Sequence, residues 1–401
     1  MTPPWRHRIL ALMAATTAAT SIGLAAPAQA GPDGSPSPAA RGVELPVGAI
    51  PWSQVSPGWS LATWSPVPGM HPGEQPAAGE PTYETATTTL YLVDPAGGRY
   101  AITTFPPPGD GPRPALVDWS GDGSRALFTL DGPGASASII EVDLHTGAQT
   151  TTAVQADFTG GYARYSRPEG KAVLIANRGY PSQPGSLVRV DLAGNHQLTY
   201  QVPQNFGGFV STPDGTQLVL GADSGLTMMG NNGIPGKALP VAGQKDCAPT
   251  RWWDTGTTVV ARCNSSSSMS QLWLVPIDGA TPTALTAPNN GQTGPDYGDL
   301  DAWRLPTGTF VQAAGACGVI FLAKLNANGT TTKVSVPDVH DDSVVVIGSH
   351  EGNLTLKARA GCGSGQTLLD YNPAAGTSTV LLGPTVNGGG VISVKTYPGQ
   401  E

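Results

Sequence analysis

The sequence predicts an all-β protein built from one repeated unit, and three observations lead to this prediction. Glycine (53 residues) and proline (38) are abundant and charged residues are only 12% of the chain, which suits short strands joined by tight turns. A hairpin phrase, DWSGDGSRALFTL at 118–130, returns as RYSRPEGKAVLIA at 164–176 and FVSTPDGTQLVLG at 209–221. The turn glycines of seven such phrases lie mostly 41 to 52 residues apart, at Gly58, Gly123, Gly170, Gly215, Gly256, Gly308 and Gly352. This spacing is typical of four-stranded propeller blades, so we predict a β-propeller of seven blades, with six or eight blades as alternatives.

The first thirty residues have the layout of a secretory signal peptide. A basic start (MTPPWRHR) precedes an apolar stretch from Ile9 to about Ala26, and the small residues Ala28 and Ala30 define the expected cleavage position. No later stretch of the sequence is long and apolar enough to cross a bilayer. We therefore expect residues 1–30 to be removed and the mature protein to be secreted, with no membrane span.

The mature chain is predicted to be one domain with two irregular segments. Residues 31–45 (GPDGSPSPAARGVEL) offer little to bury and are expected to form a flexible leader. The propeller domain follows at 46–401, and its clearest unit, 115–154, alternates strands and Gly-containing turns. Within the domain, the Pro- and Gly-rich insertion 66–84 cannot contribute to a core, so we expect it to be disordered.

The repeated hairpin resembles a known repeat. The segments WSGDGSRALFTL, STPDGTQLVLG and SRPEGKAVLIA are similar to the W-S-P-D-G-x-x-L-x-F repeats of TolB-like propellers, a broad family of secreted and periplasmic WD-type repeat domains. The fifth phrase has DTG in place of PDG, the sixth has LPTG, and the seventh (GSHEGNL) lacks the aromatic residue. Because many unrelated functions share this repeat, the resemblance implies a fold and leaves the activity open.

The phrase itself is interpreted as scaffold. Its glycine permits the positive φ of a tight hairpin turn. Its aromatic position recurs at one register of the first strand, where a large ring packs between neighbouring blades, in Trp119, Tyr165, Trp252 and Trp303. Ligand stacking on these rings is the alternative.

Four cysteines are expected to form two disulfides in an oxidising compartment. Cys247 and Cys263 lie opposite each other when the fifth hairpin is folded about its turn, so we predict that they pair within a blade. Cys317 and Cys362 each end the second strand of their unit, and we predict that they pair between the last two blades.

Charged residues on the innermost strands are the candidates for ligand contact. Asp118, Arg164 and Arg251 precede the aromatic position by one residue, and strand alternation directs them toward the channel or the adjacent blade. Three charges at one register are unusual in a chain with so few charges. We expect them to pair with one another or with water, with ligand contact as the alternative, and Arg304 is a further candidate at the channel mouth.

Two acidic loops precede the last two inner strands, and both are expected to open on the same face. Clustered carboxylates suit a hard cation such as Ca²⁺, although neither loop has the spacing of a known calcium loop. We therefore expect solvated turns and no cofactor, and we retain a metal site as the alternative. Its candidate ligands are Asp296, Asp299, Asp301, Asp341 and Asp342.

His340 lies among carboxylates in the second of these loops, between Asp338 and Asp341. This arrangement raises the pKa of a histidine and would suit acid–base catalysis, with a solvated histidine as the alternative. The sequence contains no GxSxG, HExxH or phosphate-loop motif.

These features favour a binding function over an enzymatic one. The formal charge is −8 for the whole chain and −10 once residues 1–30, with Arg6 and Arg8, are removed. Such a chain lacks the basic surface that nucleic acid requires. We expect a monomeric, non-enzymatic module that engages a protein, peptide or glycan through one face. The alternative is a propeller lyase or hydrolase with its site at the channel mouth.

Overall fold

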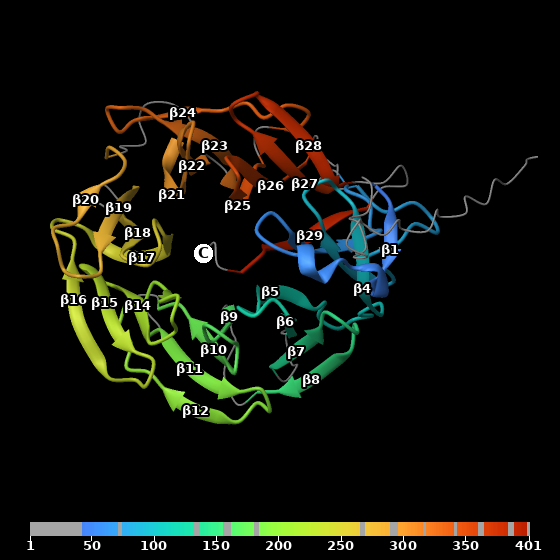
Figure 1. Ribbon diagram of the computed structural model, residues 1–401, viewed down its shortest axis with the longest axis horizontal. Helices are drawn as coiled ribbons and strands as arrows, with labels where there is room; N and C mark the ends of the chain where they lie inside the picture. Colours follow the sequence, from blue (N-terminus) through green and yellow to red (C-terminus); the bar gives the residue numbers. More distant parts are fainter. Residues whose placement is uncertain are drawn as a thin grey trace, which may run out of the picture.

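The computed structural model shows sheets arranged radially around a central channel, as a β-propeller requires (Figure 1). It describes residues 42–70, 74–130, 137–154, 162–179, 184–264, 269–288, 296–315, 318–340, 343–359, 365–383 and 389–398. The predicted signal peptide and most of the predicted leader lie outside these residues. No helix among the described residues has the length and apolar character needed to cross a membrane.

Four sheets have four antiparallel strands in sequence order, each with its first strand innermost (Figure 1). The first contains β5 (Ala115–Trp119), β6 (Arg125–Leu130), β7 (Ser138–Asp143) and β8 (Gln149–Ala153). The second contains β9 (Tyr162–Tyr165), β10 (Ala172–Asn177), β11 (Ser186–Asp191) and β12 (His196–Thr199). The third contains β13 (Phe209–Ser211), β14 (Gln217–Ala222), β15 (Gly225–Gly230) and β16 (Pro235–Pro240). The fourth contains β25 (Val345–His350), β26 (Asn353–Arg359), β27 (Gln366–Asn372) and β28 (Thr377–Leu382).

The two ends of the chain meet in a fifth sheet. Its strand order is β1-β4-β3-β2-β29, so the last strand of the chain pairs with the first long one and closes the ring. The strands are β1 (Glu44–Pro46), β2 (Ser60–Ser65), β3 (Thr88–Val93), β4 (Arg99–Phe105) and β29 (Gly390–Thr396). Two short 3₁₀ helices, η1 (Val47–Ala49) and η2 (Trp52–Gln54), link β1 to β2.

The prediction of seven separate blades is corrected by the sixth sheet, which has eight strands. Among the described residues five sheets are single blades of four or five strands, whereas this sheet joins two consecutive four-strand runs. One run is β17 (Lys245–Trp252), β18 (Thr258–Asn264), β19 (Ser270–Pro276) and β20 (Thr283–Ala284). The other is β21 (Asp296–Leu305), β22 (Gly308–Gly315), β23 (Ile320–Leu325) and β24 (Thr331–Lys333).

A glycine explains the fusion of these two runs. They are joined by one parallel bridge, between Ser270 of β19 and Gly298 of β21. Gly298 has a φ of +145°, and a Cβ there would lie 2.3 Å from Ser270 Oγ, so only glycine allows the two backbones to meet. The repeat spacing contains no signal for this contact.

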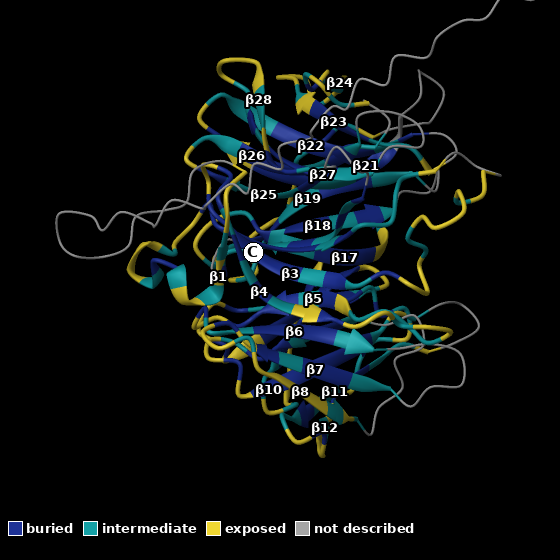
Figure 2. Ribbon diagram, turned by 90° about the vertical axis from the view of Figure 1, so that its right-hand side faces the viewer, coloured by how far each residue is buried: buried dark blue, intermediate teal, exposed yellow. Residues whose placement is uncertain are grey.

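The hairpin phrases form the tight turns that the sequence predicts. All seven predicted turn glycines have positive φ. At Gly215 the glycine has a second role, because a Cβ would lie 1.8 Å from the carbonyl oxygen of Arg167 in the preceding blade. The aromatic rings of this register, Trp119, Tyr165, Trp252 and Trp303, are 9% exposed or less. Figure 2 shows buried residues along the strands and exposed residues mainly in the connecting loops.

The predicted pairing of Cys247 with Cys263 is confirmed, with the disulfide joining β17 and β18 inside one blade. A disulfide is compatible with an oxidising compartment. Cys317 and Cys362 lie outside the described residues.

The two irregular segments of the prediction are partly described. Glu44 and Leu45, predicted to end the leader, belong to β1 and pair with β4. The described parts of the insertion, 66–70 and 74–84, contain turns but no strand or helix. At its end Arg113 contacts Tyr83, with the guanidinium 4.4 Å from the ring centroid.

Candidate ligand-binding cavity in the channel

Asp118 pairs across blades, with a partner that the sequence analysis did not name. Arg167 Nη1 donates to Asp118 Oδ2 and Nη2 to Oδ1, both at 3.1 Å. The backbone N–H of Tyr165 donates to Oδ2 at 2.7 Å. The side chain of Asp118 is 2% exposed and that of Arg167 15%, so this two-pronged ion pair is buried between β5 and β9.

Arg251 also pairs across blades. Its Nε donates to Asp301 Oδ2 at 3.0 Å, and its guanidinium lies 4.2 Å from the ring centroid of Trp303. Thr250 Oγ1 donates to the other carboxylate oxygen of Asp301 at 2.8 Å. Asp118 and Arg251 thus join neighbouring blades, each through a partner outside the predicted set of Asp118, Arg164 and Arg251.

A cavity of 420 Å³ lies in the channel, and we call it the cationic cavity. Most of its wall comes from six innermost strands, β5, β9, β13, β17, β21 and β29. Four of its lining residues carry positive charge: Arg164 on β9, Arg178 after β10, Arg262 on β18 and Lys395 on β29. No carboxylate is among the described residues that line it.

The charges of the cationic cavity act on one another. Burial lowers the pKa of the Arg262 guanidinium and the nearby charge of Arg178 lowers it further, whereas Asp301 raises it. Asp301 is thus the carboxylate that compensates this part of the cavity, and it already accepts bonds from Arg251 and Thr250. The cavity therefore concentrates positive potential in a chain whose net charge is negative.

Tyr162 of β9 positions two of these arginines. The guanidinium carbons of Arg164 and Arg178 lie 5.8 and 5.9 Å from its ring centroid. The ring stacks on Phe209 at 5.7 Å between centroids, and the hydroxyl accepts the N–H of Phe209 at 2.8 Å. Contacts to both the ring and the hydroxyl hold the Tyr162 side chain in place, so its ring positions the two guanidinium groups through cation–π contacts.

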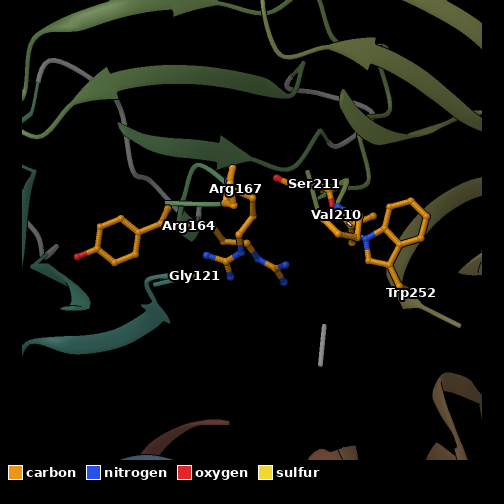
Figure 3. A pocket seen from close by; sticks show the side chains of 9 residues that line it. Gly121, Arg164, Arg167, Val210, Ser211 and Trp252 are labelled. Carbon is orange, nitrogen blue, oxygen red and sulfur yellow. Dashed lines mark hydrogen bonds between the residues drawn. The ribbon is translucent and has the colours of Figure 1, made fainter. Parts of the chain in front are cut away.

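Arg164 also borders a second, smaller cavity of 140 Å³, which we call the apolar cavity. Its lining residues are Gly121, Arg164, Tyr165, Arg167, Pro168, Val210, Ser211, Pro213 and Trp252. Figure 3 shows Arg164 and Arg167 pointing in the same direction, with Trp252 beyond Val210 and Ser211. Arg164 is therefore the residue that the two cavities share.

The remaining arginine candidate lies elsewhere. Arg304 is exposed and lines a different cavity together with Arg251, Trp252, Trp253 and Trp303. Of the four predicted channel residues, Arg164 alone lines the cationic cavity.

The first predicted acidic loop is part of a strand, which corrects that prediction. Asp296, Asp299 and Asp301 lie on β21, where two register shifts against β22 accommodate them. Asp299 is 2% exposed and lies opposite Ala313. The bulges explain the error, because the segment lacks the regular alternation that marks a strand.

The second acidic loop lies away from the cationic cavity. Asp338 and His340 are exposed, and the backbone N–H of His340 donates to the carbonyl of Arg359 at 2.7 Å. Asp341 and Asp342 lie outside the described residues. Within the part of the chain that the structure describes, no three His, Cys, Asp or Glu side chains are grouped as a metal site would require.

Sequence reasoning missed Arg178, Arg262 and Lys395. Lys395 lies on the innermost strand β29, where it pairs with Leu61 of β2. Arg262 lies on β18, the second strand of its blade, where it pairs with Ala248 of β17. Arg178 follows β10, outside the repeated phrase. The signal that could have found them is the scarcity of charge itself, because lysines and arginines are only 21 of 401 residues.

No protein-family model and no curated protein matches the sequence. Solved structures resemble the fold. A prolyl endopeptidase chain is similar with a TM-score of 0.50 and 10% identity, over 85% of this chain and 51% of that one. The β-propeller domain of the trilobed protease from Pyrococcus furiosus has a TM-score of 0.48 and 9% identity, over 74% and 90% of the two chains. TolB from Acinetobacter baumannii has a TM-score of 0.43 and 12% identity, over 84% and 66%.

Sequence identities this low indicate similarity of fold alone, and the activities of those proteins cannot be assigned to this chain. The repeated hairpin, best preserved as WSGDG at 119–123, and the radial arrangement of the sheets both indicate the fold. On both grounds the chain is a β-propeller, and its repeated hairpin resembles the repeats of TolB-like propellers.

Proposed function

We propose that this protein is a non-enzymatic binding module whose channel binds an anionic group on a protein, peptide or glycan. The observation that supports this proposal is the cationic cavity, where Arg164, Arg178, Arg262 and Lys395 line one space without a carboxylate among the described lining residues. An arginine fork donates two parallel hydrogen bonds to a carboxylate, sulfate or phosphate, so such a ligand matches this wall in both charge and shape.

Electrostatics explains why a ligand is the expected partner of this cavity. Positive charges that share a half-buried space repel one another, and Arg262 is half-buried. An anionic ligand would relieve the repulsion of the cavity. Arg178 is exposed, so a ligand can reach it from solvent.

The alternative, a lyase or hydrolase at the channel mouth, gains no support from the described residues. It needs His340 and carboxylates to converge on the channel arginines. His340 and Asp338 are exposed and line none of the cavities described above. Asp301, the carboxylate that acts on Arg262, is held by Arg251 and Thr250.

We infer that the module acts outside the cytoplasm as a single propeller domain. The signal-like residues 1–30 and the disulfide between Cys247 and Cys263 support this inference.

Calorimetric titration of the mature protein, residues 31–401, tests the proposal. The probes are hexaglutamate and a hexapeptide of glutamine, which share length and backbone. We expect hexaglutamate to bind at least about tenfold more tightly, and its binding to weaken with salt.

Two charge reversals locate the binding site. Arg178→Glu should weaken hexaglutamate binding by at least about tenfold, while the control Arg304→Glu, also an exposed arginine, should change it by less than about twofold. Equal binding of the two peptides, or equal losses in the two variants, would contradict the proposal.

A further inference from the structure

Three polar side chains that line the apolar cavity, those of Tyr165, Trp252 and Arg167, already have hydrogen-bond partners within the protein. The hydroxyl of Tyr165 donates to Glu141 at 3.1 Å, and the indole N–H of Trp252 donates to the carbonyl of Ser211 at 2.8 Å. Arg167 holds Asp118 with both guanidinium nitrogens. A ligand in this cavity therefore meets mainly rings and aliphatic groups.

The apolar part of the wall comes from three consecutive blades. Tyr165 ends the inner strand β9 and Pro168 lies in the turn after it, Val210 and Pro213 belong to β13 and its turn, and Trp252 ends β17. Val210 is 3% exposed and Trp252 9%, so these two side chains belong to the packed interior, whereas Pro168 and Pro213 are exposed at the rim.

The size of the apolar cavity sets the size of its occupant. It measures 140 Å³. A cavity of about 150 Å³ with apolar walls accepts one benzene ring. Burying such a ring away from water favours its binding. The cavity is therefore suited to one aromatic ring.

We propose that the ligand of this protein is an aromatic carboxylate, with its ring in the apolar cavity and its carboxylate beside Arg164. This inference rests on the proposed function and specifies its ligand. Arg164 is shared by the two cavities, so a ring and a carboxylate joined by a short chain can occupy both at once. The side chain and terminal carboxylate of a C-terminal phenylalanine have this chemistry.

The test compares three small probes on the mature protein by calorimetry or ligand-observed NMR. They are 3-phenylpropionate, propionate, which lacks the ring, and 3-phenylpropionamide, which lacks the charge. We expect 3-phenylpropionate to bind at least about tenfold more tightly than either of the others.

Filling the apolar cavity should abolish the tighter binding of 3-phenylpropionate relative to propionate. Val210→Leu should bring 3-phenylpropionate within about twofold of propionate while leaving hexaglutamate binding unchanged. Val275→Leu is the matched control, because Val275 is buried in the same hydrophobic cluster but does not line the cavity. If Val210→Leu does not fold, Pro213→Phe supplies a second filling substitution at an exposed position of the rim.

The outcomes separate the two proposals. If hexaglutamate binds but the ring adds nothing, or Val210→Leu and Val275→Leu behave alike, the aromatic ligand is wrong and the anion site stands. If neither hexaglutamate nor any carboxylate probe binds, the proposed function itself is wrong.

Discussion

The arginines of the channel fall into two groups that differ in their surroundings. Arg167 and Arg251 lie between blades, and each has a carboxylate from the neighbouring blade within 3.1 Å. Arg164, Arg178 and Arg262 share a cavity that has no carboxylate among its described lining residues. The first arrangement joins neighbouring blades. The second is the arrangement that we propose binds an anion.

The strongest test of this contrast is removal of Asp118. Asp118→Ala removes the carboxylate that pairs with the guanidinium of Arg167. It also removes the acceptor for the Tyr165 N–H. We expect a loss of about 3–5 kcal/mol in the free energy of unfolding, measured by urea denaturation. A loss below about 1 kcal/mol would show that the blades do not depend on this pair.

Asp301 lies where the two groups meet, so its neutralisation should affect both properties. Asp301→Asn weakens the contact with Arg251 and removes the carboxylate that acts on Arg262. We expect a loss of about 1–2 kcal/mol in stability and, on the order of twofold, tighter binding of hexaglutamate. Denaturation and calorimetry measure the two effects. Weaker binding in the variant would mean that Asp301 itself helps to hold the ligand.

A carboxylate in one of the hairpin turns, Asp214, makes the stability of the scaffold depend on pH. Hydrogen bonds from Thr212 and Thr216 lower the pKa of Asp214 below its ordinary value of 3.8. A carboxylate whose pKa is depressed by folding stabilises the protein above the ordinary value, and this contribution disappears as the pH falls through the lowered value. Asp214→Asn should therefore cost less than about 1 kcal/mol near neutral pH, and this cost should shrink as the pH falls below 3.8, the ordinary pKa of an aspartate. Unfolding curves near neutral pH and below pH 3.8 test this, and an equal cost at both would contradict it.

The repeated phrase was sufficient to predict the hairpins, the positive φ of their glycines and the Cys247–Cys263 bridge, because all three depend on local geometry. The partner of Asp118 was missed because Arg167 lies in a turn with one more residue than the corresponding turn at 120–123. That extra residue lets Arg167 reach back to the preceding blade.

The cationic cavity was harder to predict for a different reason. Arg178 lies outside the repeated phrase, Arg262 is the last residue but one of its fifth copy (251–263), and closure of the ring brings Lys395 into the same cavity as Arg164. Periodicity assigns residues to strands but does not specify which side chains from separate blades share a space in the channel. The contact of Ser270 with Gly298 was missed on the same ground.

The most direct test of the account measures stability and binding together in one variant, Arg178→Gln/Arg262→Gln. If these cations serve a ligand and not the fold, the free energy of unfolding should change by no more than about 0.5 kcal/mol, while hexaglutamate binding falls by at least about tenfold. A variant that binds hexaglutamate as tightly as the wild type, or that loses stability on the scale expected for Asp118→Ala, would contradict it.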